Sequence, residues 1–342
     1  MKLDKVLIIA EAGVNHNGDL QKAIELIDVA SKTGVDVVKF QTFQADKIVS
    51  KTARKAKYQA ENIGDDDDSQ YNMLKSLELS VDDHYRLIKE CDKRGIQFFS
   101  TAFDVDGIDF LDDLGIPFFK SPSGEITNYP YLKRLAEKGK PVILSTGMAD
   151  MQEVRDAVEV LLKNGLTKND MTVLHCNTEY PTPMEDVNLK AMNSIGIELG
   201  VQVGYSDHTL GIEVPIAAVA VGAKVIEKHF TLDRDLPGPD HRASLEPNEL
   251  QEMVRAIRNI EQAISGSGKK EPSRSELKNK EVARKSIHTT RAIEAGEILK
   301  EEDIISLRPG NGISPMEWNS VIGKKTNRTY SATEILDWSS LI

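Results

Sequence analysis

Short apolar runs recur along the first 230 residues, and each ends in small, polar or charged residues. Runs of this length predict buried strands, and apolar positions spaced three or four apart between them predict helices. The eight runs are VLIIAEAG (6–13), VDVVKFQ (35–41), IQFFST (96–101), PFFKSPS (117–123), PVILSTG (141–147), TVLHCN (172–177), VQVGYSD (201–207) and KVIEKHF (224–230). Eight strands that alternate with helices predict a closed (β/α)₈ TIM barrel.

The carboxyl ends of the strands are where such a barrel carries its chemistry. Side chains two apart in a strand point the same way, so Lys39 with Gln41, Ser206 with His208, and Glu227 with His229 are each expected on one face. The candidate residues at the strand ends are Glu11, Lys39, Gln41, Thr101, Lys120, Ser145, Ser206, His208, Glu227 and His229.

Two of these candidates, His208 and His229, lie at the carboxyl ends of the last two strands and can converge on one metal ion. Two imidazoles with Glu227 or Asp240 nearby suit Mn²⁺ or Fe²⁺ better than Mg²⁺. The alternative is that both histidines are held by hydrogen bonds inside the barrel and bind no metal. His16 could join the site, whereas we expect His84 and His288 on the surface.

Two lysines, Lys39 and Lys120, can receive phosphate or carboxylate oxygens, while hydroxyls around the rim donate hydrogen bonds. The hydroxyls are those of Thr101, Ser123, Ser145 and Ser206. Such a ring suits a phosphorylated carboxylic acid. Lys120 could instead form a Schiff base, as in barrel aldolases.

The chain divides into three parts. Residues 1–264 are predicted to form the barrel, and the long interval 42–80 predicts an insertion that covers the catalytic side. Residues 265–285, with SGSGKKEPSRSELKNK, are predicted to be a linker. Residues 286–342 are predicted to form a small β-rich domain whose RPGNG loop contains Arg308.

Charge and cysteine content narrow the class of protein. The net charge of −11 argues against nucleic-acid and anionic-membrane partners. Apolar runs are too short to span a membrane, and the two cysteines, Cys91 and Cys176, indicate free thiols in the cytoplasm. We therefore expect a cytoplasmic enzyme with small-molecule substrates. The run Asp65 to Asp68 is expected to be a solvated loop.

The assembled motifs resemble those of the bacterial sialic acid synthase family, which contains N-acetylneuraminate and legionaminate synthases. The resemblance covers nearly the whole chain, including a carboxy-terminal antifreeze-like SAF domain of the β-clip type. The motifs are AEAGVNHNGDL, VVKFQTF, FFSTAFD, KSPSGEITNYPYL, ILSTGM, LHCNTEYPTPMEDVNL, GYSDHTLGI, VIEKHFTLDRDLPGPDHRASLEP and RPGNGISPMEW.

The resemblance implies roles for individual residues. It implies catalytic roles for Glu11, Gln41, Glu125 and Arg308, and metal ligation by His208 and His229. It implies substrate contacts by Lys39, Gln41, Thr101, Lys120, Ser123, Ser145, Asn177, Thr178, Tyr180, Ser206, Asp240 and Arg308. Cys176-Asn177-Thr178 stands where some relatives read Cys-Thr-Asn, so either Asn177 or Thr178 is expected to contact phosphoenolpyruvate.

The reaction implied by the resemblance condenses phosphoenolpyruvate, N-acetylmannosamine and water to N-acetylneuraminate and phosphate. The alternative is an N,N'-diacetyllegionaminate synthase that uses 2,4-diacetamido-2,4,6-trideoxymannose. The family's metal is expected to be Mn²⁺, with Mg²⁺ or Co²⁺ as alternatives, and its assembly a domain-exchanged homodimer in which Arg308 reaches the partner's barrel. The rival classes are a Schiff-base pyruvate aldolase and an ice-binding protein; a single Thr289-Thr290 pair argues against the latter.

Overall fold

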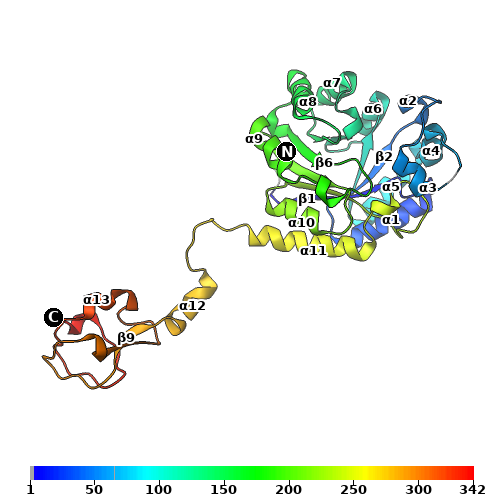
Figure 1. The fold of residues 1–342 in the computed structure, drawn as a ribbon. Coiled ribbons are helices and arrows are strands. Elements are labelled where there is room, and N and C mark those ends of the chain that lie inside the picture. Colours follow the sequence, from blue (N-terminus) through cyan, green and yellow to red (C-terminus); the bar gives the residue numbers. More distant parts are fainter. Residues whose placement is uncertain (1–3, 65) are drawn as a thin grey trace. The chain divides into compact units, whose positions relative to one another are not determined.

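A computed structural model describes residues 4–64 and 66–342 of the chain (Figure 1). It divides into two compact units, with the boundary between Ser265 and Gly266. Residues 1–3 of the predicted barrel and Asp65 of the acidic run lie outside the described residues.

Eight parallel strands form the centre of the first unit, in the order β3-β2-β1-β8-β7-β6-β5-β4. The end strands β3 and β4 also contact each other, so the sheet curls into a nearly closed barrel. The predicted TIM-barrel fold is therefore confirmed. The strands are β1 (Leu7–Gly13), β2 (Val37–Thr42), β3 (Gln97–Ala102), β4 (Phe119–Ser121), β5 (Val142–Ser145), β6 (Met171–Cys176), β7 (Gln202–Asp207) and β8 (Val225–His229).

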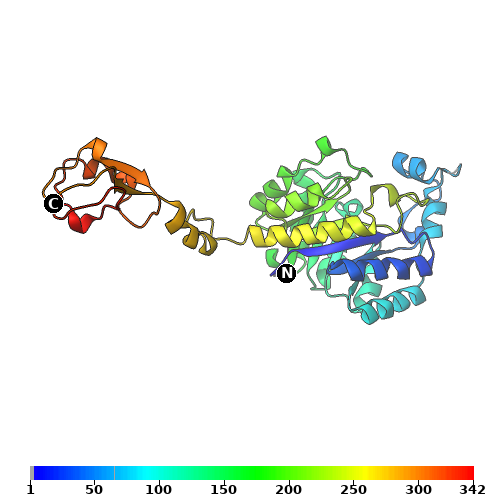
Figure 2. The same ribbon diagram turned by 90° about the horizontal axis from the view of Figure 1, so that it is seen from below.

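A helix packs outside the barrel after each strand (Figure 1). These helices are α1 (Leu20–Thr33), α5 (Val81–Arg94), α6 (Val105–Asp113), α7 (Tyr129–Glu137), α8 (Met151–Lys163), α9 (Lys190–Leu199), α10 (Glu213–Ala220) and α11 (Pro247–Ala263). Figure 2 shows α11 and α1 running along the same side of the barrel, where the two helices contact each other.

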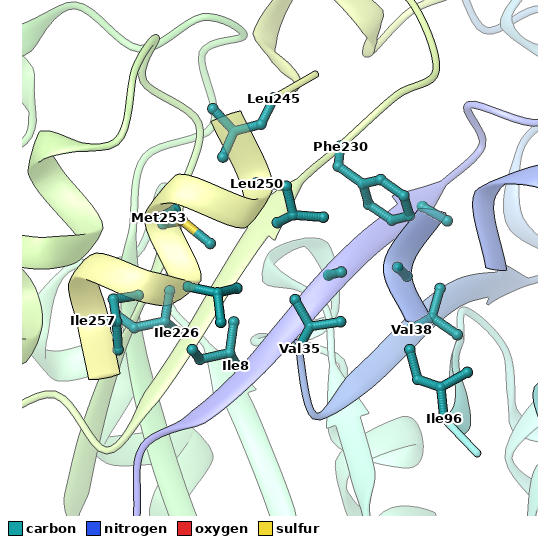
Figure 3. Close-up of a cluster of buried hydrophobic side chains, with 14 of the residues drawn as sticks. Ile8, Val35, Val38, Ile96, Ile226, Phe230, Leu245, Leu250, Met253 and Ile257 are labelled. Carbon is teal, nitrogen blue, oxygen red and sulfur yellow. The ribbon is translucent and has the colours of Figure 1, made fainter. Parts of the chain in front are cut away.

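The core lies between strands and helices. Leu250, Met253 and Ile257 repeat on one face of α11, and they pack with Ile226 of β8 and Ile8 of β1 (Figure 3). Residues of a strand that point outward thus meet apolar helix faces, whereas the alternate residues point into the barrel. This alternation directs the polar candidates toward the barrel's interior and carboxyl end.

The insertion between β2 and α5 contains three short helices, α2 (Ala45–Ile48), α3 (Lys57–Ile63) and α4 (Gln70–Leu77). It has an apolar cluster of its own, in which Met73 and Leu77 of α4 pack with Val14 and Phe43. Val14 follows β1 and Phe43 follows β2, so the insertion is fixed to the carboxyl end of the barrel.

The second unit contains the antiparallel pair β9 (Ser286–Thr289) and β10 (Ile304–Leu307), and the short helix α13 (Trp318–Val321). Ile287, Ile293, Tyr330 and Leu336 are among its buried core residues. The predicted small β-rich domain is confirmed.

The segment predicted as a linker contains a helix that the sequence pattern did not reveal, α12 (Arg274–Ala283). None of its residues is buried, so no apolar periodicity marked it. Its signal was a capping box, in which the Ser273 N–H donates to Glu276 Oε2 at 2.8 Å.

Two histidines expected on the surface are buried, and that prediction was wrong. His84 is 1% exposed, and hydrogen bonds to Thr42 and to the Ser80 carbonyl satisfy both nitrogens of its buried ring. His288 is 3% exposed and bonded to the Ser286 carbonyl. In the described part of the chain, no helix is both long and apolar enough to cross a membrane.

Candidate active site

Four buried ionisable side chains meet inside the barrel; we call Glu11, Lys39, Lys120 and Glu227 the lysine–glutamate cluster. Lys39 Nζ lies 2.5 Å from Glu11 Oε2 and 3.5 Å from Glu227 Oε2, and Lys120 Nζ lies 2.9 Å from Glu227 Oε1. Glu227 thus bridges both lysines. The cluster comes from β1, β2, β4 and β8, so closure of the barrel is what brings it together.

Hydroxyl groups extend this cluster to neighbouring strands. Lys39 Nζ donates to Thr101 Oγ1 at 3.1 Å, and Ser206 Oγ donates to Glu227 Oε1 at 2.9 Å. The ring of lysines and hydroxyls expected from the sequence is therefore present in part, but Glu227 holds it together. Sequence reasoning placed Glu227 among the strand-end candidates and near the metal, but did not give it this bridging role.

The pKa values of the Glu11 and Glu227 carboxyl groups are shifted in opposite directions. Burial raises the pKa of Glu11 and outweighs the opposing charge of Lys39. Burial acts in the same direction on Glu227, but the ammonium groups of Lys120 and Lys39 bring its pKa well below the usual range. Two neighbouring carboxyls with opposite shifts are typical of acid–base sites. Glu227 is thus suited to remain ionised, and Glu11 to exchange a proton.

The loop end of β1 joins this cluster to the histidines. Gln41 Nε2 donates to Glu11 Oε1 at 3.3 Å. A Cβ placed on Gly13, whose φ is +53°, would lie 3.3 Å from both Glu11 Oε1 and His229 Cε1. Glycine therefore leaves the space in which Glu11, Gln41 and His229 approach one another.

His208 and His229 form the histidine pair, with ring centroids 5.3 Å apart. His208 Nδ1 is bonded to the Asn177 carbonyl at 2.5 Å, which leaves Nε2 as its free nitrogen. Burial lowers the pKa of His208 to about 4, and it also lowers the pKa of His229 well below its usual value, so burial favours the neutral form of both rings. Neutral imidazole is the form that binds metals.

The pair fits a divalent metal, although it supplies only part of a ligand set. Asp240 Oδ2 lies 3.9 Å from His229 Nδ1, a buried nitrogen with no hydrogen-bond partner among the described residues. Burial, together with the charge of Glu11, raises the pKa of Asp240 to about 7. No group of three or more His, Cys, Asp or Glu side chains within residues 4–64 and 66–342 is arranged to hold a metal by itself. Any metal here would keep positions open for substrate and water.

An aromatic stack closes one side of the histidine pair. Tyr180 stacks on His208 with centroids 4.0 Å apart, and Tyr58 of α3 stacks on Tyr180 at 5.1 Å. The insertion therefore reaches the site, as predicted for a covering segment. Sequence reasoning missed Tyr58, because a tyrosine in a polar helix has no spacing that distinguishes it from a surface residue.

A second group of polar residues lies at the ends of β4, β5 and β6. Ser123 Oγ accepts from the Gly147 N–H at 3.0 Å, and a Cβ on Gly147 would lie 2.5 Å from Thr178 Cγ2. Ser145 Oγ is buried without a hydrogen-bond partner in the described structure. We call Ser123, Ser145, Gly147 and Thr178 the serine cradle. Unsatisfied buried hydroxyls are rare in native proteins, so this one favours a bound polar ligand.

The two residues left open by the sequence differ in their surroundings. Asn177 Oδ1 accepts from the Glu179 N–H at 2.7 Å, so that side-chain oxygen stabilises its own loop. Thr178 faces Gly147 in the serine cradle.

Three remaining candidates are not joined to these groups by a described contact. Glu125, two residues beyond Ser123, is half-buried, and its carboxylate accepts a hydrogen bond from Asn128 Nδ2 at 2.5 Å. His16 packs against Phe40 in the outer layer and accepts from the Gly18 N–H. Arg308 belongs to the second unit, where its Nε donates to the Ala283 carbonyl at 2.9 Å.

Taken together, the barrel end offers cations and hydroxyls for an anion, a neutral histidine pair, and a carboxyl with a raised pKa. Metal-assisted addition to a carbonyl by an anionic substrate is the chemistry that these groups fit.

Comparison with known proteins identifies relatives of both units of the chain. Residues 26–270 match the NeuB family, and residues 284–342 match the SAF domain. The chain is 49% identical to N,N'-diacetyllegionaminic acid synthase of Campylobacter jejuni over 98% of this chain and 99% of that protein. It is 50% identical to the enzyme of that name from Legionella pneumophila, covering 98% and 94% of the two chains.

A solved structure resembles the chain less closely in sequence. The N-acetylneuraminic acid synthetase of Leptospira borgpetersenii, crystallised with citrate, aligns with a TM-score of 0.70 at 35% identity, over 82% of this chain and 92% of that one.

Proposed function

The chain belongs to the NeuB family and carries a SAF domain, and from this we propose that it is an N,N'-diacetyllegionaminic acid synthase. The observation that carries the proposal is the 49–50% identity, over nearly the full length, to two enzymes of that name. The structurally similar N-acetylneuraminic acid synthetase is only 35% identical. The comparison thus favours the alternative sugar, 2,4-diacetamido-2,4,6-trideoxymannose, over the N-acetylmannosamine that the motifs first suggested.

The proposed reaction is a transfer that forms a carbon–carbon bond. The methylene carbon of phosphoenolpyruvate bonds to the aldehyde carbon of the open-chain sugar, and the oxygen of water adds to carbon 2. The bond from carbon 2 to the phosphate oxygen then breaks. One molecule each of phosphoenolpyruvate, sugar and water becomes one nine-carbon 2-keto-3-deoxy acid and one phosphate.

The anionic substrate is proposed to bind between the lysine–glutamate cluster and the serine cradle. Lys39 and Lys120 would attract its carboxylate and phosphate, with hydroxyls of Thr101 and Ser206 completing the contacts. Because Gly147 has no side chain, Ser123 and Thr178 can both approach its backbone, and we propose that their hydroxyls face the anion. Glu11 is proposed to move the proton that the aldehyde oxygen must gain, since burial raises its pKa above the usual range of a carboxyl group.

The sugar is proposed to lie on the side of the histidine pair, next to Gln41, Tyr180 and Asp240. His208 and His229 would hold a divalent metal there, for which we propose Mn²⁺. When bound, such a metal acts as a Lewis acid on the aldehyde oxygen. Glu125, two residues from Ser123, is proposed to contact the sugar from the opposite rim.

The assembly is proposed to be a domain-exchanged homodimer in which Arg308 binds the N-acyl group of a sugar in the partner's barrel. This proposal follows from the family and from the position of Arg308 in a separate compact unit with its own core. A cytoplasmic location likewise stays a prediction, to which two buried free cysteines are suited.

The test of the proposed function compares two sugars. The purified full-length protein is assayed with phosphoenolpyruvate and Mn²⁺, with either 2,4-diacetamido-2,4,6-trideoxymannose or N-acetylmannosamine. Efficient phosphate release with the first sugar supports the proposal, and a preference for the second contradicts it.

A further inference from the structure

A buried ion pair lies behind the histidine pair, on the outer side of the barrel wall. Lys228 of β8 and Asp207 of β7 are both fully buried, and Lys228 Nζ lies 2.5 Å from Asp207 Oδ2. The residues that point outward beside them, Tyr205 and Ile226, belong to the apolar core. A charged pair is exceptional in this layer, because each ion loses its hydration there at a cost of several kcal/mol.

A third residue completes the network. Thr209 donates to Asp207 from its backbone N–H at 3.1 Å and from its hydroxyl at 3.0 Å. Lys228 Nζ donates in addition to the Thr209 carbonyl. Lys228 therefore contacts the residues on both sides of His208. We call Asp207, Thr209 and Lys228 the clamp.

The clamp lies next to the active site in sequence but on the opposite face of the strands. Asp207 stands between Ser206 and His208, and Lys228 stands between Glu227 and His229. In the β7–β8 ladder Asp207 is paired directly with Lys228, and Ser206 with Glu227. A slip of one residue between the strands would move both histidines out of place.

We propose that the clamp positions the histidine pair by fixing the register of β7 and β8 and the turn that carries His208. Burial of an ion pair is seldom a net source of stability, since an apolar pair of similar size is often as stable. The clamp instead fixes how the two strands are aligned, because Asp207 and Lys228 can form their ion pair in only one register. The inference rests on the proposed function for its metal.

The test separates positioning from stability by removing both charges together. In the double variant Asp207→Asn/Lys228→Met neither partner leaves an unpaired ion. The affinity of the full-length protein for Mn²⁺ is measured from the paramagnetic resonance signal of the free ion, and the melting temperature is measured in the metal-free form. We expect affinity to fall by about 10- to 100-fold, as for other groups that orient metal ligands, with little change in melting temperature.

A matched control removes another ion pair of the same barrel. Arg258 of α11 lies 2.6 Å from Asp36, which precedes β2 at the amino end of the strands, away from the site. The variant Asp36→Asn/Arg258→Met should bind Mn²⁺ within about twofold of the parent. Equal losses of affinity in the two double variants would overturn the proposal, since both would then reflect a general loosening of the barrel.

A readout without metal separates this inference from the proposed function. Amide hydrogen exchange of residues 206–209 and 227–230 should be faster in the clamp variant than in the parent, and unchanged in the control. If the parent binds no Mn²⁺, the proposed metal site is wrong. The hydrogen-exchange rates still test whether the clamp fixes the two strands. If the double variant does not fold, the variant Thr209→Val is used in its place, because it keeps both charges and the shape of the side chain. Its exchange rates in the same segments then test the proposal. Unaltered exchange in these segments would contradict the clamp.

Discussion

Lys120 Nζ lies 2.9 Å from Glu227 Oε1 inside the barrel, and this ion pair bears on the choice between two lysine chemistries. An amine that pairs with a carboxylate as an ammonium ion has no lone pair for attack on a carbonyl. The ion pair places Lys120 where its charge can help to bind an anion, and we expect it to act in this way and not as the Schiff-base amine of an aldolase.

We predict that borohydride reduction in the presence of pyruvate traps no adduct on Lys120. Lys120→Met should lower kcat/KM for phosphoenolpyruvate by at least about 100-fold, the usual cost of a lost charge-stabilising group. Lys120→Arg, which keeps the charge, should recover part of the loss. Mass spectrometry of the reduced protein checks the first expectation, and a pyruvyl group on Lys120 would favour the aldolase.

The histidine pair predicts dependence on a divalent metal. His208→Ala or His229→Ala should abolish nearly all turnover, and chelator treatment of the parent should be reversed by Mn²⁺. His175 is the control, because it lies on β6 with Nε2 bonded to the Val187 carbonyl. His175→Gln should retain the parent's metal response. Full activity in a preparation shown by elemental analysis to be metal-free would contradict the assignment.

The serine cradle predicts a steric effect at Gly147. A Cβ there would lie 2.5 Å from Thr178 Cγ2 and 2.8 Å from Ser123 Oγ. Gly147→Ala should therefore raise KM for phosphoenolpyruvate by roughly 10-fold or more, a loss of about 1.4 kcal/mol, with a smaller effect on KM for the sugar. Gly124→Ala is the control, since a Cβ at Gly124 would meet no atom within 4 Å. Equal kinetics of the two variants would exclude the cradle as the anion site.

Stability should fall in mild acid because of a buried neutral histidine. Burial lowers the pKa of His16 to about 4 from 6.5. Between these pH values His16 binds a proton in the unfolded chain but stays neutral in the folded chain. The free energy of unfolding therefore decreases as pH falls from 6.5 toward 4. The full effect of His16 is roughly 3 kcal/mol.

Urea unfolding of the metal-free protein at a series of pH values measures this effect. His16→Gln should reduce the slope of unfolding free energy against pH by about 1.4 kcal/mol per unit within that window. An identical slope in parent and variant would show that folding does not lower the pKa of His16.

Arg308 predicts a requirement for two chains. Arg308→Ala should weaken sugar use by roughly 1.5–3 kcal/mol, the worth of a charge-assisted hydrogen bond, with little effect on phosphoenolpyruvate. Mixing Arg308→Ala with His229→Ala subunits should restore activity through one intact hybrid site. Absence of rescue after demonstrated subunit exchange would mean that Arg308 serves its own barrel or none.

The barrel could be predicted from sequence because its strands and helices repeat with distinct periods, and strand ends such as Lys39 and His229 follow from those periods. Glu227 could be placed at the site but not given its bridging role, since that depends on which side chains meet across the barrel. Tyr58 lies in an insertion without periodicity, and α12 buries no residue, so neither had an apolar pattern; only the capping box at Ser273 marked α12. His84 was misplaced because burial of a histidine depends on partners distant in sequence, here Thr42.

The central claim is the identity of the sugar, and the ratio of two kcat/KM values tests it most directly. Phosphate release is measured with phosphoenolpyruvate, Mn²⁺ and each sugar in turn, and the nine-carbon product is identified by mass. We predict that kcat/KM for 2,4-diacetamido-2,4,6-trideoxymannose exceeds that for N-acetylmannosamine by at least about 10-fold, or 1.4 kcal/mol. A ratio in favour of N-acetylmannosamine would contradict the proposed function and identify the chain as an N-acetylneuraminate synthase.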